Sequence, residues 1–203
     1  MRTTIESASQ EKGGKYLPPK RERLLSDLEL ATLEGTLTQH EKEQPSSSYS
    51  VNAIRFLLYT GCRIPELLNM QWADVHLEKG YVDLQDAKGG ARVIPLNDKA
   101  KGILTSLQQQ EGNPHVFCGN LPGKPLVNIN GTWHKVRALA GIPDVRLHDL
   151  RYSFASFAVK KGIDLYTICE LIGDKDKEMP VRLVPIKLEH LKEATNKVGQ
   201  VFG

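Results

Sequence analysis

Apolar residues recur at helical spacing in the first part of the chain. Leu30, Leu33 and Leu37 lie three or four residues apart, and they follow Ser26 and Glu29, whose types and spacing form a capping box. A helix is therefore expected to begin near residue 26. The same periodicity predicts further helices at about 49–59, 98–110, 131–140, 148–161, 165–172 and 188–198.

Between the second and third of these helices, the apolar pattern changes to short extended runs at 75–77, 81–84 and 93–96. They are separated by Lys79-Gly80 and by Lys88-Gly89-Gly90, which predicts a three-stranded antiparallel meander. The expected fold class is mainly α with a small three-stranded antiparallel β-sheet (α+β). We expect this domain to fill residues 21–203, after a flexible leader at residues 1–20 that shows no periodicity.

Length and composition fit a globular protein of the cytoplasm. The 203 residues are 40% hydrophobic, and the net charge of +3 permits a nucleic-acid partner without pointing to one. No apolar run is long enough to span a membrane, and the N-terminus lacks the apolar core of a signal peptide. Three widely spaced cysteines predict reduced thiols, and no ligand spacing suggests a metal or a cofactor.

The end of the leader is basic, with Lys15, Lys20, Arg21 and Arg23. These residues fit either a solvated linker or a strap that lies along a phosphate backbone. The sequence leaves both interpretations open.

Arg63 lies where one predicted helix ends and a short one begins. Gly61 stops the first helix, and Pro65 suits the first turn of the second. A helix N-terminus favours an anion, and Glu66, one turn on, can accept a hydrogen bond from the guanidinium and orient it. The alternative is an ordinary surface Arg–Glu pair.

Two further segments carry side chains suited to a phosphate. His148 and Arg151 lie three residues apart at the start of a predicted helix and so face the same side. A guanidinium offers a planar fork for a diester, and an imidazole can exchange a proton near neutral pH. Lys88 lies at a glycine-rich hairpin tip, where an amine can reach a leaving group. The alternatives are a capping histidine beside a surface arginine, and a lysine that only aids solubility.

Together, these segments resemble the catalytic domain of the tyrosine recombinases, the phage integrase family. The resemblance runs from about residue 20 to 198 and rests on ordered motifs, which read T-G-C-R-I-P-E-L-L-N-M-Q-W-A-D-V, D-A-K-G-G-A-R-V-I-P-L, H-D-L-R-Y-S-F-A-S, D-L-Y-T-I-C-E-L-I-G and L-E-H-L-K-E-A.

The resemblance implies a reaction and roles for four residues. In this family, a tyrosine attacks a DNA phosphodiester, becomes joined to the 3′ phosphate and releases a 5′ hydroxyl, without metal or nucleotide cofactor. The motifs place the catalytic arginines at Arg63 and Arg151, the general acid at Lys88 and a proton-handling histidine at His148. Two arginines would neutralise the charge that builds on the phosphorus.

The chain departs from the family pattern in one stretch. Asp174 stands where the family usually has a histidine that donates to the phosphate, and an ionised carboxylate there would repel it. Leu183 stands at the position of the tyrosine, and a leucine has no oxygen with which to attack. We therefore expect a catalytically dead domain, and the N-terminal core-binding domain of full-length relatives is expected to be absent.

These observations leave three functional hypotheses. The first is a recombinase catalytic domain that binds double-stranded DNA and acts in DNA integration or recombination. The second is a noncatalytic DNA-binding or regulatory module, which would act on a full-length recombinase or as a homo-oligomer. The third is a helical protein-interaction domain. None takes a small-molecule substrate. The last helix carries Leu191, Ala194 and Val198 at helical spacing, which fits either a neighbouring protomer or the domain's own core.

Overall fold

Local capping signals set where the helices begin and end. At the start of the first helix, the Ser26 hydroxyl accepts a hydrogen bond from the Glu29 backbone N–H at 3.2 Å, and the Glu29 carboxylate accepts from the Ser26 N–H at 2.8 Å. This is the predicted capping box. Two other helices end at Gly61 and Gly173, which adopt left-handed φ values of 63° and 65°. Glycine tolerates this conformation because it has no Cβ.

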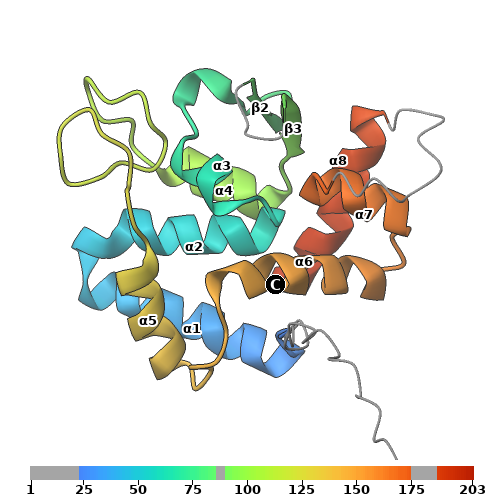
Figure 1. The fold of residues 1–203 in the computed structure, drawn as a ribbon, viewed down its shortest axis with the longest axis horizontal. Helices are drawn as coiled ribbons and strands as arrows, with labels where there is room; N and C mark the ends of the chain where they lie inside the picture. Colours follow the sequence, from blue (N-terminus) through green and yellow to red (C-terminus); the bar gives the residue numbers. More distant parts are fainter. Residues whose placement is uncertain (1–22, 86–89, 175–186) are drawn as a thin grey trace, which may run out of the picture.

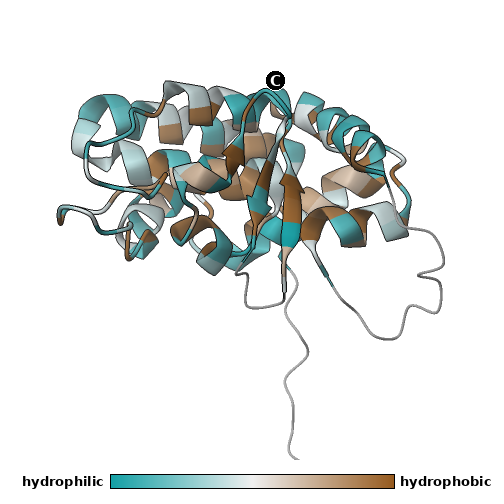
Figure 2. Ribbon diagram, turned by 90° about the horizontal axis from the view of Figure 1, so that it is seen from above, coloured by the Kyte–Doolittle hydropathy of each residue, from teal (hydrophilic) through white to brown (hydrophobic). Residues whose placement is uncertain are grey.

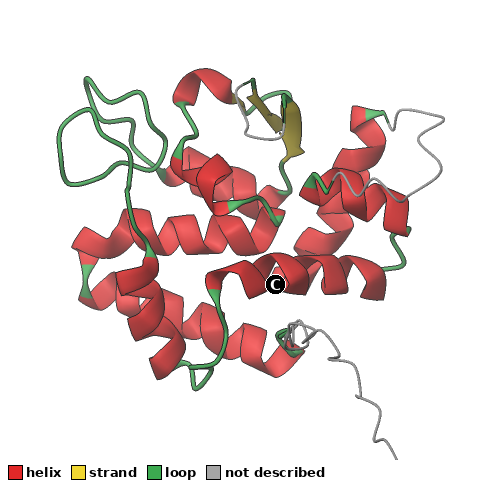
Figure 3. Ribbon diagram, viewed as in Figure 1, coloured by secondary structure: helices red, strands yellow, loops and turns green. Residues whose placement is uncertain are grey.

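The computed structural model describes residues 23–85, 90–174 and 187–203, and helices dominate this part of the chain (Figure 1, Figure 3). The helices are α1 (Asp27–Glu43), α2 (Ser48–Thr60), α3 (Ile64–Leu68), α4 (Asp98–Ser106), α5 (Asn130–Leu139), α6 (Leu147–Lys160), α7 (Leu165–Ile172) and α8 (Leu188–Gly199). Three single turns of 3-10 helix cover Pro45–Ser47, Trp72–Asp74 and Gln200–Phe202.

One small sheet lies at the edge of the helical body. Its strands are β1 (Val75–His76), β2 (Tyr81–Leu84) and β3 (Arg92–Pro95), which pair antiparallel in the order β1-β2-β3. The predicted meander and the predicted fold class are both confirmed. Strand β3 also packs against α7 and α8, so the sheet is joined to the C-terminal helices.

The core forms between α2 and α6, which pack against each other across the middle of the molecule (Figure 1). Large apolar side chains of these two helices are fully buried, among them Phe56, Leu58, Phe154 and Phe157. Figure 2 shows apolar residues gathered between the helices, with hydrophilic residues on the outward faces. Burial of these side chains stabilises the helices that carry the site.

One helix boundary differs from its prediction. The helix expected over 98–110 ends at Ser106, and Leu107 is already extended. The three glutamines that follow offer no apolar side chain to the core, so nothing favours another helical turn. Instead, the Tyr49 hydroxyl donates to the Gln108 carbonyl at 3.0 Å.

Among the described residues, no helix is both long and apolar enough to cross a membrane.

Candidate functional site

Arg63 is the N-cap residue of α3, as the sequence predicts. Its Nη1 donates to Glu66 Oε1 at 2.9 Å, and its backbone N–H donates to Glu66 Oε2 at 2.9 Å. Its Nη2 donates to the Gly173 carbonyl, at the end of α7. The Arg63 side chain is 38% exposed, whereas that of Glu66 is 5% exposed. The buried carboxylate therefore orients the guanidinium, and the alternative of a simple surface pair is wrong.

Arg151 reaches the same place from α6. Its Nη1 donates to the Gly61 carbonyl at 2.7 Å and to the Ile172 carbonyl. Within the described part of the chain, these bonds use Nη1 alone, which leaves Nε and Nη2 for a ligand. Arg151 is buried, with 6% exposure, and the fully buried Phe154 and Phe157 anchor its helix in the core.

The end of α7 brings the two arginines together. Arg63 binds the carbonyl of Gly173, and Arg151 binds the carbonyl one residue before it. Carbonyls at a helix C-terminus carry partial negative charge, which suits guanidinium donors. Burial, together with the nearby charges of Arg63 and Arg92, lowers the pKa of Arg151 to about 10. The side chain still carries its charge at neutral pH, so the site presents two adjacent cations.

Arg92, which the sequence reasoning did not single out, is a third arginine in this site. It opens β3, and its Nη2 donates to the Leu171 carbonyl at 3.2 Å. The sequence contained a signal for Arg92, because residues 92, 94 and 96 share one face of an extended run, and Ile94 and Leu96 are fully buried. A charged residue on the same face as buried apolar residues is unusual, which marks Arg92 as a candidate site residue.

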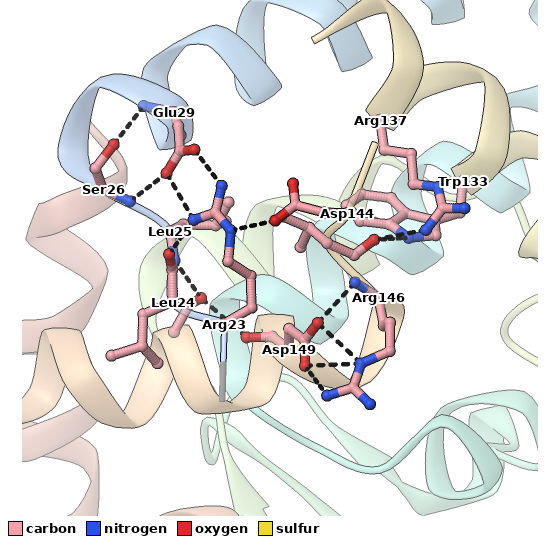
Figure 4. A network of polar contacts seen from close by, with 12 residues as sticks. Arg23, Leu24, Leu25, Ser26, Glu29, Trp133, Arg137, Asp144, Arg146 and Asp149 are labelled. Carbon is pink, nitrogen blue, oxygen red and sulfur yellow. Dashed lines mark hydrogen bonds and ion pairs between the residues drawn. The ribbon is translucent and has the colours of Figure 1, made fainter. Parts of the chain in front are cut away.

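His148 lies in the first turn of α6, and its side chain is exposed. Its ring meets the Tyr152 ring edge-on, with the centroids 4.9 Å apart. The start of this helix is fixed by Asp149, which is fully buried and accepts hydrogen bonds from the Arg146 backbone N–H at 2.8 Å and from Arg146 Nη2 at 2.7 Å (Figure 4). The structure thus holds His148 one helical turn before Arg151.

Asp174 follows Gly173 directly, at the rim of the arginine cluster. Its backbone N–H donates to the Cys169 carbonyl at 2.8 Å, and the residue is exposed. The negative charge of its carboxylate raises the pKa of Arg151 and so partly offsets the lowering by burial and by the other arginines. An acid thus stands beside the cations, as the sequence predicts.

Two predicted site positions, Lys88 and Leu183, lie outside the described residues. Their roles stay predictions.

Cys62, the residue before Arg63, is buried, and burial raises the pKa of its thiol to about 11. The thiol is therefore protonated at neutral pH and does not offer a nucleophile in place of a tyrosine.

Arg23, at the end of the basic leader, is tied to the folded domain. Its guanidinium donates to Glu29 and, at 2.8 Å through Nε, to Asp144 (Figure 4). Both partners are carboxylates of this chain, which favours a structural role for Arg23, and the strap along a phosphate backbone stays a prediction. The other basic residues of the leader lie outside the described part of the chain.

Comparison with known sequences identifies a matching family. The family model described as "Phage integrase family" matches residues 31–183, most of the chain. A tyrosine recombinase XerA of Pyrococcus furiosus is 29% identical over 199 residues, covering 90% of this chain and 68% of the relative. A tyrosine recombinase XerD of Oceanobacillus iheyensis is 31% identical, covering 78% of this chain and 57% of the relative. The integrase of Salmonella phage P22 is 27% identical, and the chain covers 43% of it.

Solved structures support the same fold. A crystal structure of XerA recombinase aligns with a TM-score of 0.63 at 24% identity, covering 78% of this chain and 58% of that one. A XerH site-specific recombinase bound to palindromic difH substrate aligns with a TM-score of 0.65 at 20% identity, covering 92% of this chain and 53% of that one. The chain thus spans between about half and two thirds of most of these proteins.

Proposed function

We propose that this chain, which belongs to the phage integrase family, uses its tyrosine-recombinase catalytic domain to bind double-stranded DNA at a backbone phosphate. One observation carries the proposal: Arg63 and Arg151, which come from separate elements, donate to adjacent carbonyls at the end of α7. Two guanidiniums held side by side suit the oxygens of a phosphodiester.

The geometry also suggests how the site binds and what each arginine does. Arg63 is the more exposed of the two and is held by Glu66, so it meets the phosphate first and fixes its orientation. Arg151 is buried, so its charge lies in poorly solvated surroundings, where electrostatic attraction is stronger than in bulk water. By family resemblance, His148 and Lys88 would handle the protons of strand cleavage.

We further propose that the domain binds DNA without forming a covalent bond to it. Leu183 occupies the position where the family has its tyrosine, and Asp174 replaces a donor to the phosphate. Such a domain would occupy recombination sites in the cytoplasm, alone or beside a full-length recombinase. This is the noncatalytic module that the sequence also allows.

Duplex binding at several salt concentrations tests the phosphate site. Arg63→Ala should weaken the binding of a fluorescently labelled duplex about ten-fold and reduce the slope of log K against log salt by about 1, because one phosphate contact is lost. Fluorescence anisotropy measures both quantities. The matched control is Lys42→Ala, which removes one exposed positive charge near the end of α1. Lys42 lies close to the beginning of α2, whereas the arginine site lies at the opposite end of that helix. Equal affinity and slope in Arg63→Ala and the wild type would refute the proposed function.

The same preparation tests for covalent chemistry. With a nicked duplex that traps a cleaved intermediate, the wild type should give no protein–DNA band on a denaturing gel, because Leu183 cannot attack. A band would show that a nucleophile exists and would direct attention to Tyr152 and Tyr166. That outcome would contradict the proposal that binding is noncovalent, but it would not contradict the proposed phosphate site.

A further inference from the structure

Three consecutive carbonyls at the end of α7 each accept a hydrogen bond from a different arginine. Those of Ile172 and Gly173 bind the two arginines already assigned to the phosphate, and the Leu171 carbonyl binds Arg92. The three arginines come from the start of α3, from β3 and from α6. The last turn of α7 therefore gathers all three cations in one place.

The charge of Arg92 is buried and poorly compensated. Its side chain is 10% exposed, and Nε and Nη1 are fully buried without a hydrogen-bond partner in the described chain. Its nearest carboxylate oxygen, Glu66 Oε1, lies 3.8 Å from Nε and already accepts from Arg63 at 2.9 Å. A buried charge without full pairing destabilises a fold, so its presence requires an explanation.

The buried interior of the cluster has an excess of positive charge. Among the described residues, Glu66 is the buried carboxylate that the three guanidiniums share, whereas Glu170 is half-buried and Asp174 is exposed at the rim. Burial lowers the pKa of Arg92, and Arg63 lowers it further. Like charges held at short range in a poorly solvated site repel one another, and a bound anion would relieve that repulsion.

We propose that Arg92 is a positioning residue of the phosphate site. Its buried charge attracts the Glu66 carboxylate, so that carboxylate neutralises less of the charge of Arg63 and Arg151. Those two arginines therefore keep positive charge for the phosphate. This role rests on the proposed function, because it presupposes that those two arginines bind a phosphate. Arg92 itself is too buried to be a catalytic residue. Its charge acts on the phosphate through its neighbours and through the end of α7.

The proposal predicts opposite effects on stability and on binding. A cation that serves only the fold would stabilise the domain, whereas Arg92 should cost stability while the site is empty. Arg92→Met keeps most of the side-chain volume and removes the charge. We expect its melting temperature without DNA to equal or exceed that of the wild type. Its affinity for a labelled duplex of mixed sequence at low salt should fall on the order of ten-fold, as for one charge lost near the ligand.

Two variants make the test specific. Arg92→Lys retains a charge and should recover most of the affinity at neutral pH, but lose it as the pH rises, because burial lowers the pKa of a lysine. Arg55→Met removes a well-paired arginine of α2, whose Nη1 lies 2.6 Å from Glu41 and whose side chain is 13% exposed. It should lower the melting temperature and leave duplex affinity unchanged.

The outcomes separate this role from the proposed function. If Arg92→Met melts lower, as Arg55→Met should, and binds the duplex like the wild type, Arg92 is a structural residue and the inference is wrong. If Arg63→Ala also fails to weaken binding, the phosphate site itself is wrong. Loss of affinity in both variants, with Arg92→Met at least as stable as the wild type, would support both.

Discussion

Single charged residues tie the beginning of the domain to the loop before α6 (Figure 4). Arg23 binds Glu29 in the first turn of α1 and Asp144 in the loop after α5. In the same region, the Leu25 backbone N–H donates to the Ser153 hydroxyl at 3.0 Å, and this hydroxyl donates to the Asp149 carbonyl at 2.9 Å. These contacts hold α1 against the helix that carries His148 and Arg151.

The Arg23–Glu29 pair predicts a pH dependence of stability. Hydrogen bonds from Arg23 and from the Ser26 backbone lower the pKa of Glu29 from 4.5 to about 2. A carboxyl with a lowered pKa in the folded state stabilises the domain above its unfolded pKa, and this contribution is lost as the pH falls from 4.5 toward about 2. Glu29→Gln should therefore be less stable than the wild type at neutral pH, and the difference should shrink through that window.

Denaturant unfolding at a series of pH values measures this difference. The matched control is Glu78→Gln, which changes an exposed carboxyl in the turn between β1 and β2. A difference between Glu29→Gln and the wild type that does not change with pH would contradict the assigned role of the pair.

Among the elements, Gly61 and Gly173 end α2 and α7 and thereby place backbone carbonyls that the arginines bind. The Gly61 carbonyl accepts from Arg151, and that of Gly173 accepts from Arg63. Both turns are tight: a Cβ on Gly61 would lie 2.7 Å from Phe154 Cδ1, and one on Gly173 would collide with the Arg92 guanidinium. The helix ends and the site are therefore built from the same residues.

Gly61→Ala should destabilise the domain by about 2 to 4 kcal/mol, since a left-handed alanine and a crowded core each cost free energy. Thermal or denaturant unfolding checks this value. Gly102→Ala is the contrasting change: Gly102 lies inside α4 with no atom near its would-be Cβ. It should stabilise the domain by up to about 1 kcal/mol. A Gly61→Ala variant as stable as the wild type would contradict the packing of this helix end.

At the scale of the whole molecule, the C-terminal segment completes the domain's own core. Ala194 and Val198 on α8 are buried, and Leu191 packs partly buried against the same core. Beyond α8, the Phe202 ring lies 4.8 Å from that of Tyr59 and 6.1 Å from that of Phe157. The apolar face of α8 is thus intramolecular, and the alternative of a face for a neighbouring protomer is wrong for Ala194 and Val198.

Phe202→Ala should lower the free energy of unfolding by about 3 kcal/mol, because it removes a buried aromatic ring from contact with two others. Gln200→Ala, an exposed position in the same single turn, should change it by less than about 0.5 kcal/mol. Unfolding in denaturant compares the two. Similar stabilities for both variants would mean that the C-terminal turn does not contribute to the core.

Helices and strands could be predicted from the amino-acid sequence alone, because the signals for them act over a single turn. The capping box at Ser26, the glycine at 61 and the short extended runs of the meander predicted helix ends and strands to within a few residues. The helix over 98–110 was predicted too long, since polar glutamines carry no stop signal. The residue motifs also predicted that Arg63, Lys88, His148 and Arg151 act together, through family resemblance rather than through distance.

How those residues meet depends on the packing of distant segments. Arg63 and Gly173 are 110 positions apart, and Arg151 and Gly61 are 90 apart, so no local pattern can encode their hydrogen bonds. They form because α2, α6 and α7 pack in one arrangement that buries the core. The same reason explains why Arg92 could not be assigned to the site from the sequence. Its role depends on its burial and on the neighbouring charges, and both are properties of the packed molecule.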